Sequence, residues 1–300
     1  KKKYQLITKS DSDTEVLIQL FEKVGVKKTL ECIDGMFSFI IYDKHQNSVY
    51  FARDRFGIKP LYYFEDNKKI IFSSEIKPLL KYSNSNLNQQ KTLDFFLRQS
   101  MDHDEDTFFS NIKCLKPSNY GKANSNNFEL KKYWEIEKKN FNKESLQETK
   151  KKIKNLFSNS IRKHLKSDRK IGFFFSGGTD STSIVSTAKK YLTKPELFTY
   201  EFLSDNKKNI YGETEKASRI AKNFKFNLDI TTVTPKKIID NFKNVIISCE
   251  SPITSIRQVC DFLLFKRFKK LDRPVAIIGH GGDELLGGYD YNFLNFILDK

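Results

Sequence analysis

An apolar run that ends in glycines, hydroxyls and a carboxylate is the part of this sequence best suited to chemistry. Residues 171–175 are apolar apart from one glycine, residues 176–178 read Ser-Gly-Gly, and Asp180 and Ser181 follow. Adjacent glycines permit a sharp turn, so backbone N–H groups and the positive end of a following helix can converge on one anion. A carboxylate beside a phosphate requires a hard cation between them. The segment therefore predicts a site for a nucleotide with Mg²⁺, the alternative being an ordinary glycine turn of an α/β protein.

A second segment repeats the pattern further along the chain. Residues 274–278 are apolar, and glycines and the acids Asp283 and Glu284 follow them. Carboxyl ends of parallel strands gather at one edge of a sheet, where open α/β folds bind ligands. Because Mg²⁺ readily takes two carboxylates together with water and phosphate oxygens, we expect Asp180 and Asp283 to face one metal-bound pyrophosphate. The alternative is that both acids only stabilise helix N-termini.

Alternating apolar runs and amphipathic stretches predict the elements that position these segments. A long amphipathic helix is expected at 145–166. After it we expect strands at 171–175, 197–203, 226–233 and 274–278, and helices at 180–191, 213–224, 235–248 and 257–270. This alternation is typical of a parallel sheet covered on both faces.

The N-terminal part is rich in short strand-like runs. Aromatic and β-branched residues gather at 36–42, 48–52, 61–64 and 70–72, with polar turns between them. Arg53 and Asp54 end one of these runs before Gly57. If their role is purely structural, we expect them to form an ion pair that holds this loop in place. Between about 100 and 145 the irregular polar composition is typical of a linker.

Together, the two glycine-rich segments resemble one family. Ser-Gly-Gly-Thr-Asp-Ser at 176–181 and Gly-Gly-Asp-Glu-Leu-Leu-Gly-Gly-Tyr at 281–289 resemble the synthetase domain of the glutamine-hydrolysing asparagine synthetases, which contains an ATP-cleaving PP-loop. Residues 12–16, 35–39, 53–63 and 73–77 resemble the later part of that family's glutaminase domain. The resemblance implies an α/β chain with a partial N-terminal-nucleophile (α+β) glutaminase domain at 1–125, a linker at 126–145 and a truncated, Rossmann-like parallel-sheet synthetase domain at 146–300.

The resemblance implies a ligase of amino-acid biosynthesis. Such an enzyme adenylates a carboxylate with ATP and aminates it with ammonia from glutamine, releasing AMP and pyrophosphate. Aspartate is the expected acceptor, and a sugar uronate of polysaccharide synthesis is the alternative acceptor. Two other functions are alternatives to this ligase: a PP-loop enzyme that modifies tRNA, and an inactive relative kept as a binding scaffold. The expected cofactors are ATP and Mg²⁺, the expected partners are glutamine, ATP and the acceptor, and a homodimer is left open.

The resemblance also assigns residues to roles. ATP and pyrophosphate binding is expected of Phe175, Ser176, Gly177, Gly178, Asp180, Ser181, Phe202, Ile278 and Gly279, metal binding of Asp180 and Asp283, and glutamine binding of Asp13. Arg257 suits the carboxylate of the acceptor. His280 stands where asparagine synthetases usually carry an acid; an imidazole can accept a proton near pH 7 but lacks that acid's charge, which leaves the acceptor open. The alternatives are core packing for the apolar residues, a solvated arginine, and a histidine that only holds its loop.

The chain departs from the family at its ends. It starts at Lys1 without a Met-Cys-Gly sequence, and none of its cysteines (Cys32, Cys114, Cys249 and Cys260) stands at the terminus to act as the nucleophile. We therefore expect a fragment of a longer protein, unable to hydrolyse glutamine alone and lacking the closing part of the synthetase domain.

Composition sets further expectations. The formal net charge of +16 could indicate a nucleic-acid partner, but the lysines are spread along the chain rather than gathered in a stripe. No apolar run is long enough to span a membrane, and no segment resembles a signal peptide. Four scattered cysteines without a C-x-x-C pair argue for reduced thiols and against zinc or disulfides, so a cytoplasmic location is expected.

Overall fold

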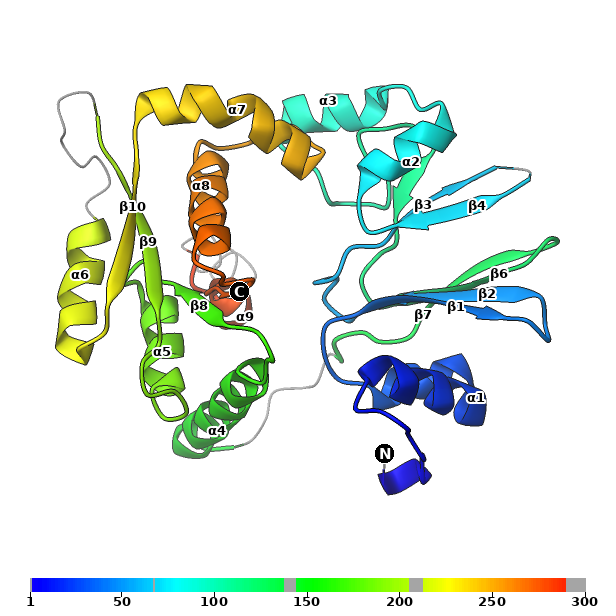
Figure 1. Cartoon of the computed structure of the whole chain (residues 1–300), viewed down its shortest axis with the longest axis horizontal. Helices are drawn as coiled ribbons and strands as arrows, with labels where there is room; N and C mark the ends of the chain where they lie inside the picture. The colour runs from blue at the N-terminus through cyan, green and yellow to red at the C-terminus, as the bar shows by residue number, and fades with distance from the viewer. Residues whose placement is uncertain (1, 67, 138–143, 205–212, 290–300) are drawn as a thin grey trace. The chain divides into compact units, whose positions relative to one another are not determined.

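The computed structural model describes residues 2–66, 68–137, 144–204 and 213–289. The chain forms two compact units, Lys1–Asn140 and Phe141–Lys300. Figure 1 shows both units.

The described residues of the N-terminal unit form two antiparallel sheets. The first has the order β1-β2-β6-β7 and consists of β1 (Ser38–Asp43), β2 (Ser48–Arg53), β6 (Asn119–Ala123) and β7 (Phe128–Lys132). The second has the order β4-β3-β5 and consists of β3 (Tyr62–Glu65), β4 (Ile70–Ser73) and β5 (Ile112–Cys114). Phe51 of β2 is fully buried in the core beneath the first sheet. Since β7 lies within residues 126–145 and pairs with β6, part of the segment expected as a linker belongs to this sheet.

Among the described residues of this unit, three helices and a short 3₁₀ turn complete the fold. They are the turn η1 (Lys2–Tyr4), α1 (Asp13–Cys32), α2 (Ile76–Ser83) and α3 (Gln89–Arg98). α1 is interrupted at Gly25, whose φ of 74° is outside the helical range.

Arg53 and Asp54 hold the loop after β2 through the backbone instead of through each other. The carboxylate of Asp54, which is 1% exposed, accepts N–H bonds from three residues of the loop, and Arg53 donates to three carbonyl groups, including that of Gly57. A Cβ on Gly57 would lie 2.9 Å from the guanidinium carbon of Arg53. In place of the expected ion pair, both charged side chains form hydrogen bonds with backbone groups.

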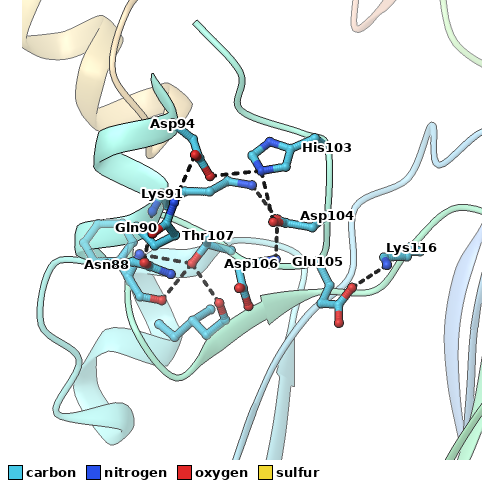
Figure 2. A network of polar contacts seen from close by, with 12 residues as sticks. Asn88, Gln90, Lys91, Asp94, His103, Asp104, Glu105, Asp106, Thr107 and Lys116 are labelled. Carbon is cyan, nitrogen blue, oxygen red and sulfur yellow. Dashed lines mark hydrogen bonds and ion pairs between the residues drawn. The ribbon is translucent and has the colours of Figure 1, made fainter. Parts of the chain in front are cut away.

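A buried lysine of α3 forms an ion pair with the segment that follows this helix, as Figure 2 shows. Lys91 is 2% exposed, and its ammonium lies 2.5 Å from Asp104. His103 lies 3.2 Å from Asp94 on α3 and 3.1 Å from Asp104. Partial burial would raise the pKa of Asp104, but the hydrogen bond and the charge of Lys91 outweigh it and lower the pKa below its usual value.

Removing the carboxylate of this pair is expected to destabilise the N-terminal unit. Asp104→Asn leaves the buried Lys91 ammonium without its counter-charge, so the free energy of unfolding in urea should fall by about 1–3 kcal/mol. Glu105→Gln is the matched control, because its pair with Lys116 is exposed and should contribute about 0–1 kcal/mol. Since the pKa of Asp104 is lowered, its contribution is complete above the ordinary value of 3.8 and disappears as the pH falls below that. Equal losses in the two variants would contradict this account.

The C-terminal unit contains a four-stranded sheet in which all described pairings are parallel. The order is β10-β9-β8-β11, with β8 (Ile171–Phe174), β9 (Leu197–Phe202), β10 (Leu228–Val233) and β11 (Val275–Ile277). The helices are α4 (Leu146–His164), α5 (Thr179–Ala188), α6 (Glu213–Phe224), α7 (Pro235–Cys249), α8 (Arg257–Lys270) and α9 (Gly282–Leu286). The predicted α/β fold with a parallel sheet is confirmed.

Adjacent residues of β8 and β9 point to opposite faces of this sheet, and each face has its own hydrophobic core. Phe173 and Leu197 pack with α4, α5 and α6, whereas Phe174 and Phe198 pack with α8. α6 and α8 both contact β9 and β10, and Figure 1 shows them on opposite sides of the sheet. This alternation of side chains is the period of two that a strand imposes.

The order of the strands reverses beside β8. The chain passes from β8 outward to β9 and β10 and then returns to place β11 on the other side of β8. Loops that leave two neighbouring strands in opposite directions open a crevice at the carboxyl end of the sheet. The two glycine-rich segments follow β8 and β11, so both lie at this crevice.

Candidate functional site

A cavity of about 480 Å³ lies at this crevice. We call residues 175–178, which lead into α5, the first loop, and residues 278–289, which include α9, the second loop. The cavity is lined from β8, the first loop and the start of α5 by Phe174, Phe175, Ser176, Gly178, Thr179, Asp180 and Ser181, from β9 by Phe198, Thr199 and Tyr200, from α8 by Arg257, Asp261 and Leu264, and from the second loop by Ile278, Gly279, His280, Asp283 and Tyr289. The two glycine-rich segments therefore share one cavity.

The first loop turns at Gly177 and leads directly into α5. Gly177 has a φ of 74°, and a Cβ on it would lie 2.9 Å from the backbone of Ala217 in α6, so only glycine fits without strain. The Ser176 hydroxyl accepts the N–H of Gly178 at 3.2 Å and lies 3.2 Å from the hydroxyl of Ser181. Because the first N–H groups of a helix lack intrahelical acceptors, the start of α5 presents donors to this cavity.

The second loop packs directly against Asp180. A Cβ on Gly279 would lie 3.2 Å from the Cβ of Asp180, and a Cβ on Gly282 would lie 2.2 Å from its Oδ2 atom. The absence of side chains at these two glycines therefore makes room for the carboxylate. Asp283, the next residue of α9, lines the same cavity.

Glu284 stabilises the second loop. Its carboxylate accepts the N–H of Gly281 at 3.0 Å and the hydroxyl of Tyr289 at 2.7 Å. The hydrogen bond from Tyr289 is the largest of the effects that lower the pKa of Glu284. Of the two acids in this segment, Asp283 is the one that lines the cavity.

Arg257, Asp261 and His280 add further charged or titratable side chains to the lining of the cavity. Arg257 and Asp261 lie four residues apart on α8, and His280 lies on the second loop. Burial raises the pKa of the Asp261 carboxyl above its usual value, and the charges of Arg257 and His280 offset this only in part. This part of the cavity thus combines both signs of charge.

The structure brings most of the expected site residues together, with three exceptions. Gly177 shapes the first loop without lining the cavity. Phe202 packs in the core formed by β10, α7 and α8. Asp13 is the exposed first residue of α1 in the other unit.

Sequence reasoning missed Thr199, Tyr200 and Asp261. Tyr200 lies two residues before Phe202 on the same face of β9, so an earlier position on that strand lines the cavity. Asp261 lies one helical turn after Arg257, and this spacing was the available signal.

Within the described ranges, no group of three or more His, Cys, Asp or Glu side chains is gathered to hold a metal ion, and no helix is long and apolar enough to cross a membrane. Asp180 and Asp283, from the two glycine-rich segments, offer carboxylates to a metal, and Asp261 on α8 adds a third carboxylate to the lining of the cavity.

Comparisons with known proteins match both units of the chain. A glutamine amidotransferase domain model matches residues 1–134, and an asparagine synthase model matches residues 152–298. Glutamine-hydrolysing asparagine synthetases 2 and 1 of Bacillus subtilis are 32% and 28% identical, each over 94% of this chain. A probable asparagine synthetase of Acanthamoeba polyphaga mimivirus is 30% identical over 96% of the chain. The chain covers 40%, 44% and 52% of these three relatives, about half their length.

Proposed function

We propose that this chain, which belongs to the family of glutamine-hydrolysing asparagine synthetases, catalyses the ATP-dependent amidation of a carboxylate through an acyl-adenylate. The products are AMP, pyrophosphate and the amide, with ammonia taken from glutamine. Aspartate is the proposed acceptor. The observation that carries the proposal is the packing of Asp180 against the second glycine loop, whose Asp283 lines the same cavity.

The first loop is suited to the pyrophosphate end of ATP. The start of α5 offers backbone N–H groups, and Ser176 and Ser181 offer hydroxyls beside them. Such donors stabilise the negative charge that develops on pyrophosphate as it leaves. Phe175, Ile278 and Gly279 line the same cavity and are proposed to contact the nucleotide.

Asp180 and Asp283 are suited to Mg²⁺. Hard carboxylate oxygens are the protein ligands this ion prefers, and it usually keeps water and substrate phosphate oxygens for its other positions, so a pair of acids is enough. When bound, the ion would neutralise charge on the pyrophosphate. Without it, two carboxylates in one cavity would repel that leaving group.

Arg257 and His280 are proposed to act on the acceptor. A guanidinium can bind a carboxylate through two parallel hydrogen bonds and hold it toward the nucleotide. A neutral imidazole at His280 can take the proton that the attacking ammonia loses. Both side chains line the cavity with the first loop.

The N-terminal unit is proposed to belong to the glutaminase part of the protein, with Asp13 binding the α-amino group of glutamine. We place the boundary between the two functions within residues 126–145, which contains the division of the chain at Asn140.

The products of ATP cleavage test this proposal. The full-length protein, given ATP, Mg²⁺, aspartate and ammonium, should form AMP and pyrophosphate in equal amounts, as measured by ³¹P NMR. Ammonium replaces glutamine here so that the result depends on the synthetase part alone. Formation of ADP and phosphate would exclude the proposal.

A further inference from the structure

Asp261 lies outside both glycine-rich loops, yet its carboxylate faces the cavity. It lines the cavity from the second turn of α8, together with Arg257 and His280. It is only partly exposed, so its charged form loses some hydration. A carboxylate in such a place needs a positive partner.

Arg257 does not take that place. Residues four apart on a helix lie on the same face, and an arginine and an aspartate at this spacing commonly pair. Within the part of the chain that the structure describes, however, neither side chain forms a hydrogen bond or an ion pair through its charged group. Arg257 is also the first residue of α8, where the helix dipole disfavours a cation. Both charges thus stay available to a ligand.

The other groups around this part of the cavity do not neutralise Asp261. Tyr200 and Thr199 line the cavity from β9, His280 from the second loop, Asp180 from α5 and Asp283 from α9. Of these only His280 can become positive, and Glu284 of α9 also lies near its ring. A ligand that brings its own positive charge would fit beside Asp261.

We infer that Asp261 is a specificity-determining residue that binds an ammonium group of the acceptor while Arg257 binds the carboxylate next to that ammonium. This inference rests on the proposed function and deepens it, because it selects an α-amino acid over an acid without an amino group, such as a uronate. A guanidinium and a carboxylate one helical turn apart match the two charged groups of an α-amino acid.

The test compares L-aspartate with succinate, which has the same two carboxylates and no amino group. ATP–pyrophosphate exchange is measured on the full-length protein and on its variants Asp261→Asn, Asp261→Glu and Asp240→Asn, the last an exposed acid of α7 changed in the same way. Wild type and Asp240→Asn should prefer aspartate. Asp261→Asn should raise the KM for aspartate by about 10- to 100-fold, the typical loss of a charge-assisted hydrogen bond, with kcat and the KM for succinate little changed. Asp261→Glu should restore part of the affinity.

Two results would overturn the inference. One is equal use of aspartate and succinate by the wild type. The other is an unchanged preference for aspartate in Asp261→Asn, provided that this variant melts at the same temperature as the wild type. Either would leave the proposed function intact, because exchange would still occur. Absence of exchange with every acid, or ADP formation by the wild type, would instead strike the proposed function itself.

Discussion

Asp180→Asn is expected to reduce ATP–pyrophosphate exchange by roughly 10²- to 10³-fold, the loss typical of removing one group that stabilises developing charge. The amide keeps the size of the carboxylate but removes the charge that a magnesium-bound pyrophosphate needs. Because Asp180 lies at the start of α5 and packs against two glycines, the neutral side chain should fit without disturbing the loops. The rate is measured with saturating aspartate and Mg²⁺ on the full-length protein.

Asp240→Asn is the matched control for this result. It makes the same chemical change on an exposed position of α7 and should leave the exchange rate within twofold of the wild type. Thermal melting of both variants excludes unfolding as the cause. If Asp180→Asn kept its exchange rate, Asp180 would be no more than a helix N-terminal acid.

Gly282→Ala is expected to cause a comparable loss through geometry alone. The new Cβ would lie 2.2 Å from the Asp180 Oδ2 atom, so the carboxylate must rotate away from its position in the cavity. Rotation of a short side chain costs the fold little, and alanine is a better helix former than glycine by about 1 kcal/mol. Activity should therefore fall while the melting temperature stays the same or rises.

Gly279→Ala provides a graded comparison. Its Cβ would lie 3.2 Å from the Cβ of Asp180, a contact that a shift of a few tenths of an ångström relieves. Its exchange rate should fall between those of the wild type and Gly282→Ala. The reverse order, or equal activity in both variants, would mean that the second loop does not position Asp180.

The sequence predicts the C-terminal unit well because its elements depend on local patterns. The helices at 213–224 and 257–270 have the predicted bounds, and the four strands differ from prediction by at most two residues at either end. Buried parallel strands are nearly continuous apolar runs, and their helices carry one apolar face. The common edge for the two glycine loops follows from this alternation.

The N-terminal unit was less predictable, partly because its sheets join strands far apart in sequence, β2 with β6 and β3 with β5, and partly because some elements carry no clear local signal. β7, in a polar stretch, pairs with β6 although its residues are mostly exposed. The roles of Arg53 and Asp54 depend on where the loop folds back, which short-range patterns do not encode. A buried carboxylate surrounded by N–H groups cannot be distinguished in sequence from one in an ion pair.

The lining of the cavity also depended on tertiary packing. Tyr200 and Phe202 both pack against the core formed by β10, α7 and α8, but of the two only Tyr200 also lines the cavity, and the sequence pattern does not distinguish them. Asp261 faces the cavity because α8 packs against β9 and β10, a contact between segments far apart in the chain. The positions of the motif residues were predictable, because these residues directly follow β8 and β11 in the sequence.

A double-mutant cycle on pyrophosphate binding tests most directly whether Asp180 and Asp283 act together. Affinity for pyrophosphate with Mg²⁺ is measured by isothermal titration calorimetry for the wild type, Asp180→Asn, Asp283→Asn and the double variant. If both acids hold one ion, each single change should weaken binding by at least about tenfold, and the double variant should be little weaker than either single variant. Losses that simply add, or binding that does not depend on Mg²⁺ in the wild type, would contradict the shared site.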